Sequence, residues 1–407
     1  MAKDPNPAKP TIPVEEHRAR IAELIGELPV IDLPVAECLG LVLAADLRSP
    51  LSLPPFDNSA MDGYAVRAAD LHGASQETPV ELPVTGDIPA GRTDPVTLAA
   101  GTALRIMTGA PLPAGADSVV QVELTDGGVE RVRVFEPVET GTHLRLRGED
   151  VVTGDTVLTA GTILGPSHLG LAAAVGSATL PVRRPKVLVL STGSELVEPG
   201  QPLEPGQIYE SNGVMLASAV RAIGGEAEIL RFVPDDVTAF HKTLAEELPG
   251  ADLLITSGGV SAGAYEVVKD ALTGHGVEFV RVAMQPGGPQ GAGRYQGVAV
   301  ATLPGNPVSS ALSFELFLRP TLRAAMGFPE PDRPTATARL ASGVRTPLGK
   351  RQYRRAHYDP ATGLVDVVGG PGSHLLASLA AANCLMVIPE EASELPSGAE
   401  IQVILLD

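Results

Sequence analysis

The sequence contains no tryptophan, only two cysteines and no apolar run near the roughly 18 residues of a membrane span. Cys38 and Cys384 are too few and too distant for a disulfide framework or a CxxC site, so we expect a reducing, cytoplasmic location. The stretch from Met1 to Pro13 lacks the apolar core of a signal peptide, and its prolines predict a disordered arm.

Positive charge is also scarce. The chain has 30 Lys and Arg against 48 Asp and Glu, which gives a net charge of −18. Such a chain repels a nucleic-acid backbone as a whole, although one locally basic pocket stays compatible with it. We therefore expect neither a nucleic acid nor a membrane as a partner.

Glycine and proline are abundant, with 44 and 37 copies among 407 residues, and they break the chain into many short elements. This length predicts several domains rather than one core. Apolar positions at helical spacing predict a packing helix from Val14 to Leu28, which Pro29 ends. Short alternating runs predict a small inserted β module between Pro79 and Val138, and a small terminal β barrel or sandwich from Pro331 onward.

Three apolar stretches that predict buried strands run directly into loops of small residues. They are 186–190 followed by 191–195, 253–255 followed by 257–263, and 298–303 followed by 304–309. Beyond the carboxyl end of a parallel strand, glycine lets N–H groups approach a phosphate and serine adds donors. A single such loop is explained equally well as a tight turn. Three of them favour a site for phosphate or an oxyanion.

The order of elements around these loops is strand, helix, strand, helix, strand, which predicts a doubly wound parallel sheet. A helix is expected over 214–223, and another from about Val308 would present its amino end to the third loop, where free N–H groups favour an anion. Two polar clusters precede this region, Asp57 to Gly63 and Arg145 to Asp150. Each is compatible with simple turns or with contacts to a ligand.

Six motifs occur in one order along the chain: NSAMDGYAVR, RLRGED, STGSEL, GQIYESN, SGGVSAGAYE and LPGNPVSS. With these motifs the sequence resembles the molybdopterin molybdenumtransferase family, the relatives of gephyrin's E domain. The resemblance implies a multidomain α/β plus β fold, in which a doubly wound molybdopterin-binding-like domain is combined with an inserted β module and a C-terminal β barrel. Its expected boundaries are 14–47 with 142–182, then 48–141, 183–330 and 331–407.

The resemblance also implies a function. Members insert molybdate into adenylylated molybdopterin and release AMP, and they act as homodimers in which one subunit's NSAMDGYA loop completes the other's site. Asp62 would then act on the partner's cleft. Because the substrate contains a pyrophosphate bridge, a divalent cation held by carboxylates, Mg²⁺, is expected.

Matching positions give the expected site. The catalytic acids are Asp62, Asp150, Glu195, Asp236 and Glu266, and the metal ligands among them are Glu195, Asp236 and Glu266. Asp235 is an alternative to Asp236, and Glu266 stands where the family commonly has Asp. The expected substrate-binding residues are Thr192, Ser257, Gly258, Gly259, Ser261, Pro304, Gly305, Asn306, Ser309, Arg355 and Ser373.

One segment departs from the family pattern. Where the family reads KPGKP, this chain has Gln285 and Gly288 in place of the two lysines. Losing a charge-assisted hydrogen bond costs about 1.5–3 kcal/mol, so molybdate affinity is expected to fall unless Arg355 compensates. A non-catalytic molybdopterin-binding or scaffold paralogue is therefore an alternative to the active transferase. A third hypothesis is that the enzyme inserts tungstate rather than molybdate.

Overall fold

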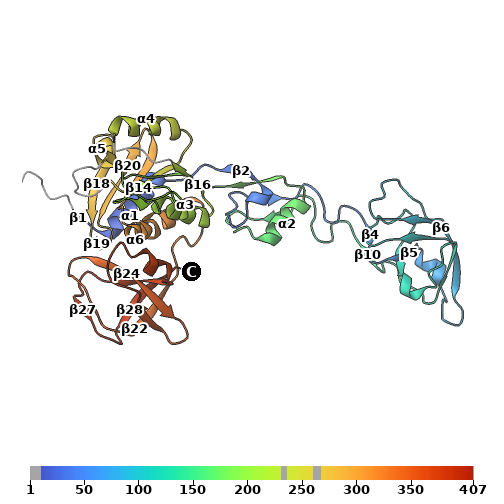
Figure 1. Cartoon of the computed structure of the whole chain (residues 1–407). Coiled ribbons are helices and arrows are strands. Elements are labelled where there is room, and N and C mark those ends of the chain that lie inside the picture. The colour runs from blue at the N-terminus through green and yellow to red at the C-terminus, as the bar shows by residue number, and fades with distance from the viewer. Residues whose placement is uncertain (1–10, 231–235, 260–266, 407) are drawn as a thin grey trace, which may run out of the picture.

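The computed structural model describes residues 11–230, 236–259 and 267–406. The chain is elongated: an α/β unit and a C-terminal barrel lie side by side at one end, a small middle unit follows, and a β unit occupies the opposite end (Figure 1). We call this last part, residues 58–145, the distal unit. None of the helices in the described ranges has the length and apolar character needed to cross a bilayer.

The α/β unit is built on a seven-stranded sheet. Its strands, in spatial order, are β1 (Thr11–Ile12), β18 (Val277–Val282), β20 (Pro289–Tyr295), β21 (Val298–Leu303), β17 (Leu253–Ser257), β13 (Lys186–Ser191) and β16 (Glu226–Leu230). The strands β21, β17, β13 and β16 are mutually parallel, as predicted. The sheet as a whole is mixed rather than parallel throughout, because β20 runs antiparallel to both of its neighbours.

The reason for the antiparallel strand is local. Gln296 and Gly297, with φ of 50° and 89°, form the two-residue connection between β20 and β21. Two successive positive φ values are the mark of a type I′ turn, whose twist suits a hairpin. A chain that turns back over two residues can pair only in the antiparallel sense.

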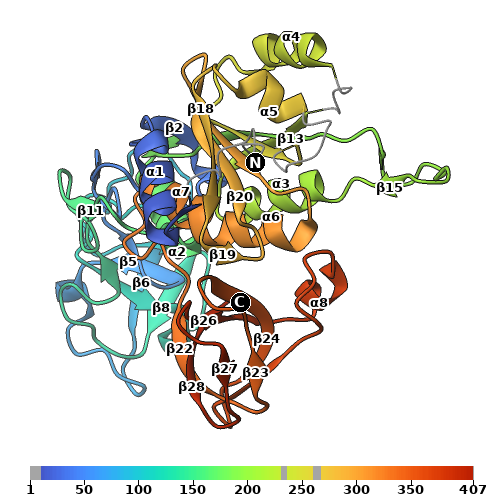
Figure 2. The same ribbon diagram turned by 90° about the vertical axis from the view of Figure 1, so that its left-hand side faces the viewer.

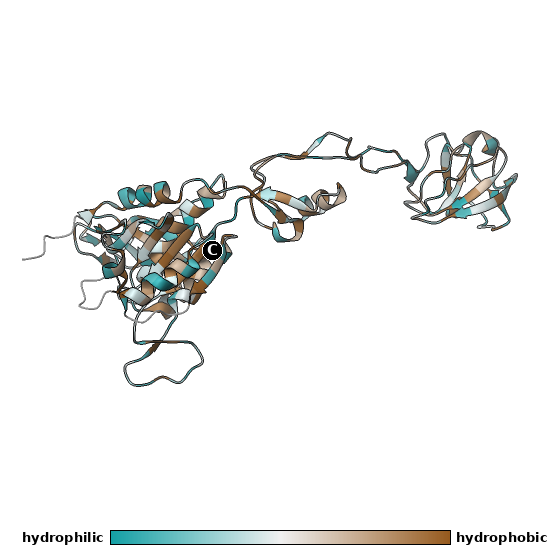
Figure 3. Cartoon of the chain, turned by 90° about the horizontal axis from the view of Figure 1, so that it is seen from above, coloured by the Kyte–Doolittle hydropathy of each residue, from teal (hydrophilic) through white to brown (hydrophobic). Residues whose placement is uncertain are grey.

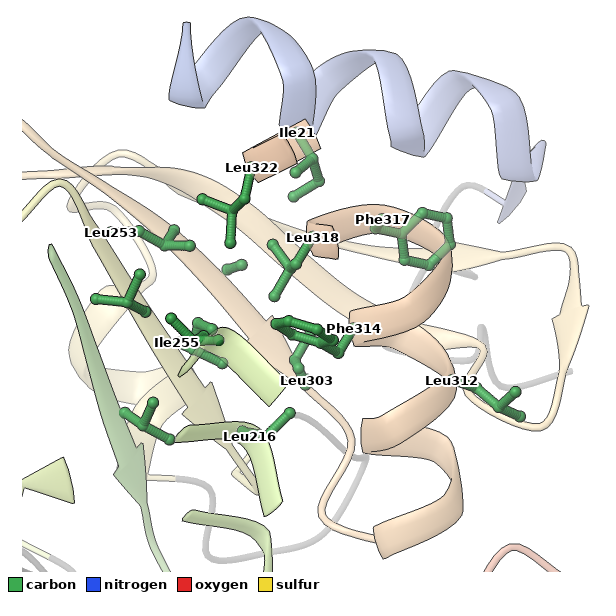
Figure 4. Close-up of a cluster of buried hydrophobic side chains, with 14 of the residues drawn as sticks. Ile21, Leu216, Leu253, Ile255, Leu303, Leu312, Phe314, Phe317, Leu318 and Leu322 are labelled. Carbon is green, nitrogen blue, oxygen red and sulfur yellow. The ribbon is translucent and has the colours of Figure 1, made fainter. Parts of the chain in front are cut away.

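Helices cover both faces of this sheet, which confirms the doubly wound arrangement (Figure 2). One face carries α1 (Val14–Ile25), α3 (Asn212–Ala222), α6 (Pro307–Ser313), the π-helical turn η4 (Phe314–Leu318) and α7 (Arg319–Ala325). The other face carries α4 (Val237–Glu247) and α5 (Val267–Leu272). Strand residues alternate between the faces, so Val187 joins the first core and Leu188 the second. Figure 4 shows Ile255, Leu303 and Phe314 in the first core.

The N-terminal segment differs from its prediction. Residues 1–10 lie outside the described ranges, but Thr11 and Ile12, which we expected in a disordered arm, form β1 beside β18. The helix α1 ends at Gly26, whose φ is 63°, and not at Pro29. Val14 and Ile21 of this helix are buried in the core of the α/β unit. The domain boundaries proposed above stay a prediction.

The middle unit is formed by two separate parts of the chain. Its strand pairs are β2 (Ile31–Pro34) with β12 (Thr179–Val182) and β3 (Leu47–Arg48) with β11 (Thr156–Leu158). The helix α2 (Pro166–Ala174) and the short turn η1 (Val35–Glu37) complete it. The core contains Leu43, Leu164 and Leu180.

The distal unit is the predicted inserted β module, and extended chain segments connect it to the middle unit (Figure 3). Its five-stranded sheet has the order β8 (Ser118–Gln121), β5 (Gly63–Val66), β7 (Ala103–Ile106), β6 (Val80–Ile88) and β9 (Arg131–Val134). Two short turns, η2 (Ala68–Leu71) and η3 (Val122–Leu124), accompany it. At its inner end β4 (Asn58–Ser59) pairs with β10 (Leu144–Arg145).

The C-terminal strands form the predicted barrel. They are β22 (Thr335–Leu340), β24 (Arg351–Asp359), β25 (Leu364–Val367), β26 (Cys384–Ile388) and β28 (Glu400–Leu405), with β23 (Val344–Arg345) and β27 (Glu394–Leu395) as a separate pair. Pairing of β24 with β26 closes the sheet. The short strand β19 (Met284–Gln285) pairs with β24, so this connection fixes the barrel beside the α/β unit.

Candidate functional site

A cleft of about 790 Å³ lies beyond the carboxyl ends of β13, β17 and β21. All three predicted loops line it, so the structure brings together what the sequence placed at three strand ends. The predicted binding residues among its lining are Thr192, Glu195, Ser257, Gly258, Gly259, Pro304, Gly305, Asn306, Ser309 and Ser373. Ser261, Glu266 and Asp235, the alternative to Asp236, lie outside the described residues.

The loop after β13 carries Glu195. Its carboxylate lies against Gly193: a Cβ built at Gly193, where φ is 153°, would be 2.7 Å from both carboxylate oxygens. After Glu195 the chain leaves the body as an arm held by β14 (Leu196–Val197) and β15 (Ile208–Tyr209), which run parallel to each other (Figure 2). The arm returns to the cleft at Glu210.

The loops after β17 and β21 touch each other and the first loop. Gly258 has φ of 94°, and a Cβ there would be 2.9 Å from the backbone oxygen of Thr192. A Cβ on Gly305 would be 3.3 Å from the Cα of Gly258. Only glycine permits this spacing, since any side chain would force the three loops apart. Close approach of the backbone is the property that a phosphate cradle needs.

At the amino end of α6, one of the backbone N–H groups that the sequence predicts to be available for an anion is already hydrogen-bonded. The N–H of Val308 donates to the backbone oxygen of Ser373 in the barrel, at 3.1 Å. This bond brings Ser373 and His374 to the rim of the cleft. The barrel therefore contributes directly to the site.

Two residues of the GQIYESN motif belong to the cleft although we did not predict them as site residues. Asn212 donates from Nδ2 to the Ser257 hydroxyl and to the Gly305 oxygen, both at 2.7 Å. Glu210 accepts from the Ser191 hydroxyl and from the N–H of Gly213, also at 2.7 Å. The motif was the only sign in the sequence that these two residues belong to the site. Their partners Ser257, Gly305 and Ser191 are distant in sequence, so the hydrogen bonds themselves could not be predicted.

Arg355 does not line the cleft. Its guanidinium is buried and donates to the backbone oxygens of Gly370 and Gly372, the latter at 3.0 Å. Burial lowers the pKa of this guanidinium. Arg355 thus holds the loop that precedes Ser373, and Arg351 is paired with Glu390 and Glu15.

The two positions that lack lysine are occupied in different ways. The side-chain oxygen of Gln285 accepts from the amide of Gln352 at 3.3 Å. Gly288 is buried, and a Cβ there would be 3.3 Å from the oxygen of Val282. Among the described residues that line the cleft there is no Lys or Arg, whereas Glu195 and Glu210 are both present.

Three of the predicted acids lie elsewhere in the described part of the chain. Asp236 is the N-cap of α4, and its carboxylate accepts from the N–H of Ala239 at 2.8 Å. Asp62 lies between β4 and β5 of the distal unit, and Asp150 lies in the connection between β10 and β11. Figure 1 shows the distal unit at the end of the molecule opposite the α/β unit. Within the described ranges, no group of three or more His, Cys, Asp or Glu residues is arranged to hold a metal ion.

Asp62 has a defined environment. Its carboxylate accepts from the N–H of Thr108 at 2.7 Å and from the Thr108 hydroxyl at 2.8 Å. The backbone bond, followed by the hydroxyl bond, lowers the pKa of Asp62 below its usual value. The residue is exposed and therefore accessible to another molecule. Asp150 is exposed as well.

Comparison with known proteins covers most of the chain. Family models match residues 12–176 (MoeA N-terminal region, domain I and II), 188–324 (probable molybdopterin binding domain) and 337–406 (MoeA C-terminal region, domain IV). Molybdopterin molybdenumtransferase 2 of Mycobacterium tuberculosis is 55% identical over 398 residues, which cover 96% of this chain and 98% of that protein. Molybdopterin molybdenumtransferase 1 of the same organism is 38% identical, with 97% and 98% covered.

A solved structure agrees. The molybdopterin biosynthesis moeA protein from Pyrococcus horikosii has a TM-score of 0.75 and 32% sequence identity, and the alignment covers 98% of this chain and 100% of that one. Matches of this extent, in sequence and in fold, include the cleft and each unit described above. The chain therefore belongs to the MoeA family of molybdopterin molybdenumtransferases.

Proposed function

We propose that this chain inserts molybdate into adenylylated molybdopterin and releases AMP. The observation that carries the proposal is the convergence of three glycine-bearing loops on one cleft, where Gly258 lies between Thr192 and Gly305. In the overall reaction, water cleaves the pyrophosphate to give AMP. The two dithiolene thiols replace one molybdate oxygen, which leaves as water with both thiol protons.

The residues divide by chemistry. For phosphate, Thr192 and Ser257 supply hydroxyls and Gly259 an N–H, together with Ser261. Gly258, whose own N–H donates to the Leu303 oxygen, permits the close approach of the backbone. The other side of the cleft holds the pterin and molybdate. Its residues are Pro304, Gly305, Asn306, Ser309 and Ser373. Arg355 acts there by supporting the loop that carries Ser373.

A divalent cation, Mg²⁺, belongs to this proposal. Mg²⁺ binds through one or two carboxylates together with substrate phosphates and water. Glu195 suits this role, because its carboxylate lines the cleft and accepts no hydrogen bond from the described residues. Asp236 and Glu266 complete the proposed ligand set; the first now caps α4, and the second is outside the described ranges. When bound, the ion would neutralise charge on the departing AMP.

The proposed enzyme is a cytoplasmic homodimer in which Asp62 and Asp150 act on the partner's cleft. The support is the length of the molecule. The cleft belongs to the α/β unit and Asp62 to the distal unit, and Figure 1 shows these two units at opposite ends. Mixing Asp62→Asn with Glu195→Gln chains tests this. If the acids act in trans, each mixed dimer has one intact site, and about a quarter of the activity returns. If they act within one chain, none returns.

The primary test is AMP release from adenylylated molybdopterin with Mg²⁺, with and without molybdate. We expect molybdate-stimulated release by the wild type and a loss of at least about 100-fold in Glu195→Gln. Glu198→Gln is the matched control, because Glu198 is exposed on the same arm and does not line the cleft. Equal rates in both variants would contradict the role of Glu195.

The absence of Lys and Arg from the described lining favours one alternative, a non-catalytic molybdopterin-binding or scaffold protein. Gln285→Lys separates the two functions, since position 285 tolerates a longer side chain better than the enclosed Gly288. A scaffold disabled by the lost charge should gain AMP release in this variant. An active enzyme should change little.

A further inference from the structure

A single amide connects two of the loops that form the cleft. Asn212, the first residue of α3, donates one Nδ2 proton to the hydroxyl of Ser257 and the other to the backbone oxygen of Gly305, each at 2.7 Å. Ser257 ends β17, and Gly305 follows β21. Apart from the backbone bond from the N–H of Gly258 to the oxygen of Leu303, the spacing of these two loops therefore depends on this one side chain.

The third loop is connected through the same short segment. Glu210 accepts from the hydroxyl of Ser191, the last residue of β13, and from the N–H of Gly213, the second residue of α3. A Cβ at Gly213 would lie 2.8 Å from the Glu210 carboxylate, so a side chain there would displace the carboxylate from this contact. Glu210 thereby fixes the start of α3, and with it the position of Asn212.

The chemistry of these contacts requires an amide. Both acceptors, a hydroxyl oxygen and a carbonyl oxygen, are satisfied by the two protons of one NH₂ group. The Asn212 oxygen is buried and has no partner among the described residues. A carboxylate at this position would face the Gly305 oxygen with no proton to donate, so the hydrogen bond would be replaced by repulsion between two oxygens.

We propose that Asn212, supported by Glu210, is a positioning residue that sets the spacing between the phosphate loop after β17 and the loop after β21. This inference rests on the proposed function, in which the substrate's phosphate lies on the first loop and its molybdate end on the second. Neither loop needs the other to hold its own ligand. Reaction requires both ends at a fixed separation, and a misplacement near 1 Å costs about 100-fold in rate.

The test compares Asn212→Asp with Ser218→Ala, a control that is exposed on the same helix. In Asn212→Asp we expect kcat for AMP release to fall at least about 100-fold, while the Kd of AMP alone changes less than about threefold. Hydrogen–deuterium exchange in segments 253–259 and 298–306 should rise about tenfold or more, with the rest of the sheet unchanged. Ser218→Ala should match the wild type.

Two results would overturn the proposal. One is unchanged kcat and exchange in Asn212→Asp. The other is a parallel loss of kcat, AMP affinity and thermal stability, which would indicate a general structural role. If the wild type releases no AMP, the proposed function is refuted instead. Hydrogen–deuterium exchange and the Kd of AMP then decide whether Asn212 positions the two loops.

A double-mutant comparison adds an independent check. Asn212→Ala and Ser257→Ala remove opposite ends of one hydrogen bond, so in the ligand-free protein their effects on hydrogen–deuterium exchange in segment 298–306 should not add. The double variant is expected to exchange within about threefold of Asn212→Ala alone; exchange is the measure because Ser257 also belongs to the proposed phosphate site, so its loss lowers kcat by itself. Multiplied increases in exchange would show that the two side chains act separately and would refute the shared connection.

Discussion

Replacing His17 should make the α/β unit less sensitive to acid. His17 lies on α1 with 1% of its surface exposed, and its ring packs edge-on against Phe317 with centroids 4.8 Å apart. Its Nδ1 is buried without a partner among the described residues. Burial, with a smaller contribution from Arg20, lowers the pKa of His17 from 6.5 to about 4.

The sign follows from proton binding. Between these two pKa values the unfolded chain binds a proton at His17 and the folded chain does not, so stability is lost as pH falls through the window from 6.5 to about 4. The full pKa shift of His17 corresponds to about 3 kcal/mol of folding stability, and about 2 kcal/mol of this stability is lost when the pH falls to about 5. His17→Leu should remove this component, because leucine has no proton to bind.

The assay is hydrogen–deuterium exchange in β20 and β21, since the chain has no tryptophan to report unfolding. At about pH 5, after correction for intrinsic exchange, the wild type should have lost about 2 kcal/mol more of its opening free energy than His17→Leu. Exposed His72→Gln is the control and should follow the wild type. An identical pH dependence in wild type and His17→Leu would refute the reasoning.

Three further predictions concern loops and thiols. Gly258→Ala should destabilise the protein by about 1–3 kcal/mol more than Gly250→Ala in urea unfolding, because both have positive φ but only the first Cβ meets a backbone oxygen, and equal losses would contradict this. Arg355→Lys should raise the molybdate concentration for half-maximal rate about tenfold and speed hydrogen–deuterium exchange in residues 370–374, because a lysine ammonium cannot make the two divergent hydrogen bonds of the guanidinium. A rate effect with unchanged exchange would indicate instead that Arg355 contacts molybdate directly. Cys384 should resist alkylation until the chain unfolds, because burial raises the pKa of its thiol to about 11, and rapid labelling of the native protein would count against it.

Much of the fold was readable from local signals. Buried strands that end in glycine predicted the three loops of the cleft, because the required backbone conformations at Gly258 and Gly259 are open to few other residues. The antiparallel strand β20 was missed, although Gln296 and Gly297 are a readable turn signal. The role of Arg355 was not readable, since its partners become neighbours only when the barrel closes.

Asn212 illustrates a different limit. The sequence places it at the start of a helix, where asparagine commonly serves as a cap. Its side chain instead bonds to residues 45 and 93 positions away. No local pattern distinguishes these two uses, because the choice depends on which loops the sheet brings beside α3.

The predicted acids show why a motif alone does not identify a ligand. Asp236 uses its carboxylate to cap α4, and Asp62 uses its own to hold Thr108. Removing either charge therefore also releases a piece of backbone, so a loss of activity in such a variant does not by itself assign a role in chemistry. The Glu195 carboxylate lines the cleft and, among the described contacts, accepts no hydrogen bond from the backbone. Substitution there changes charge with the least change in structure, which makes Glu195 the acid whose loss speaks most directly about the reaction.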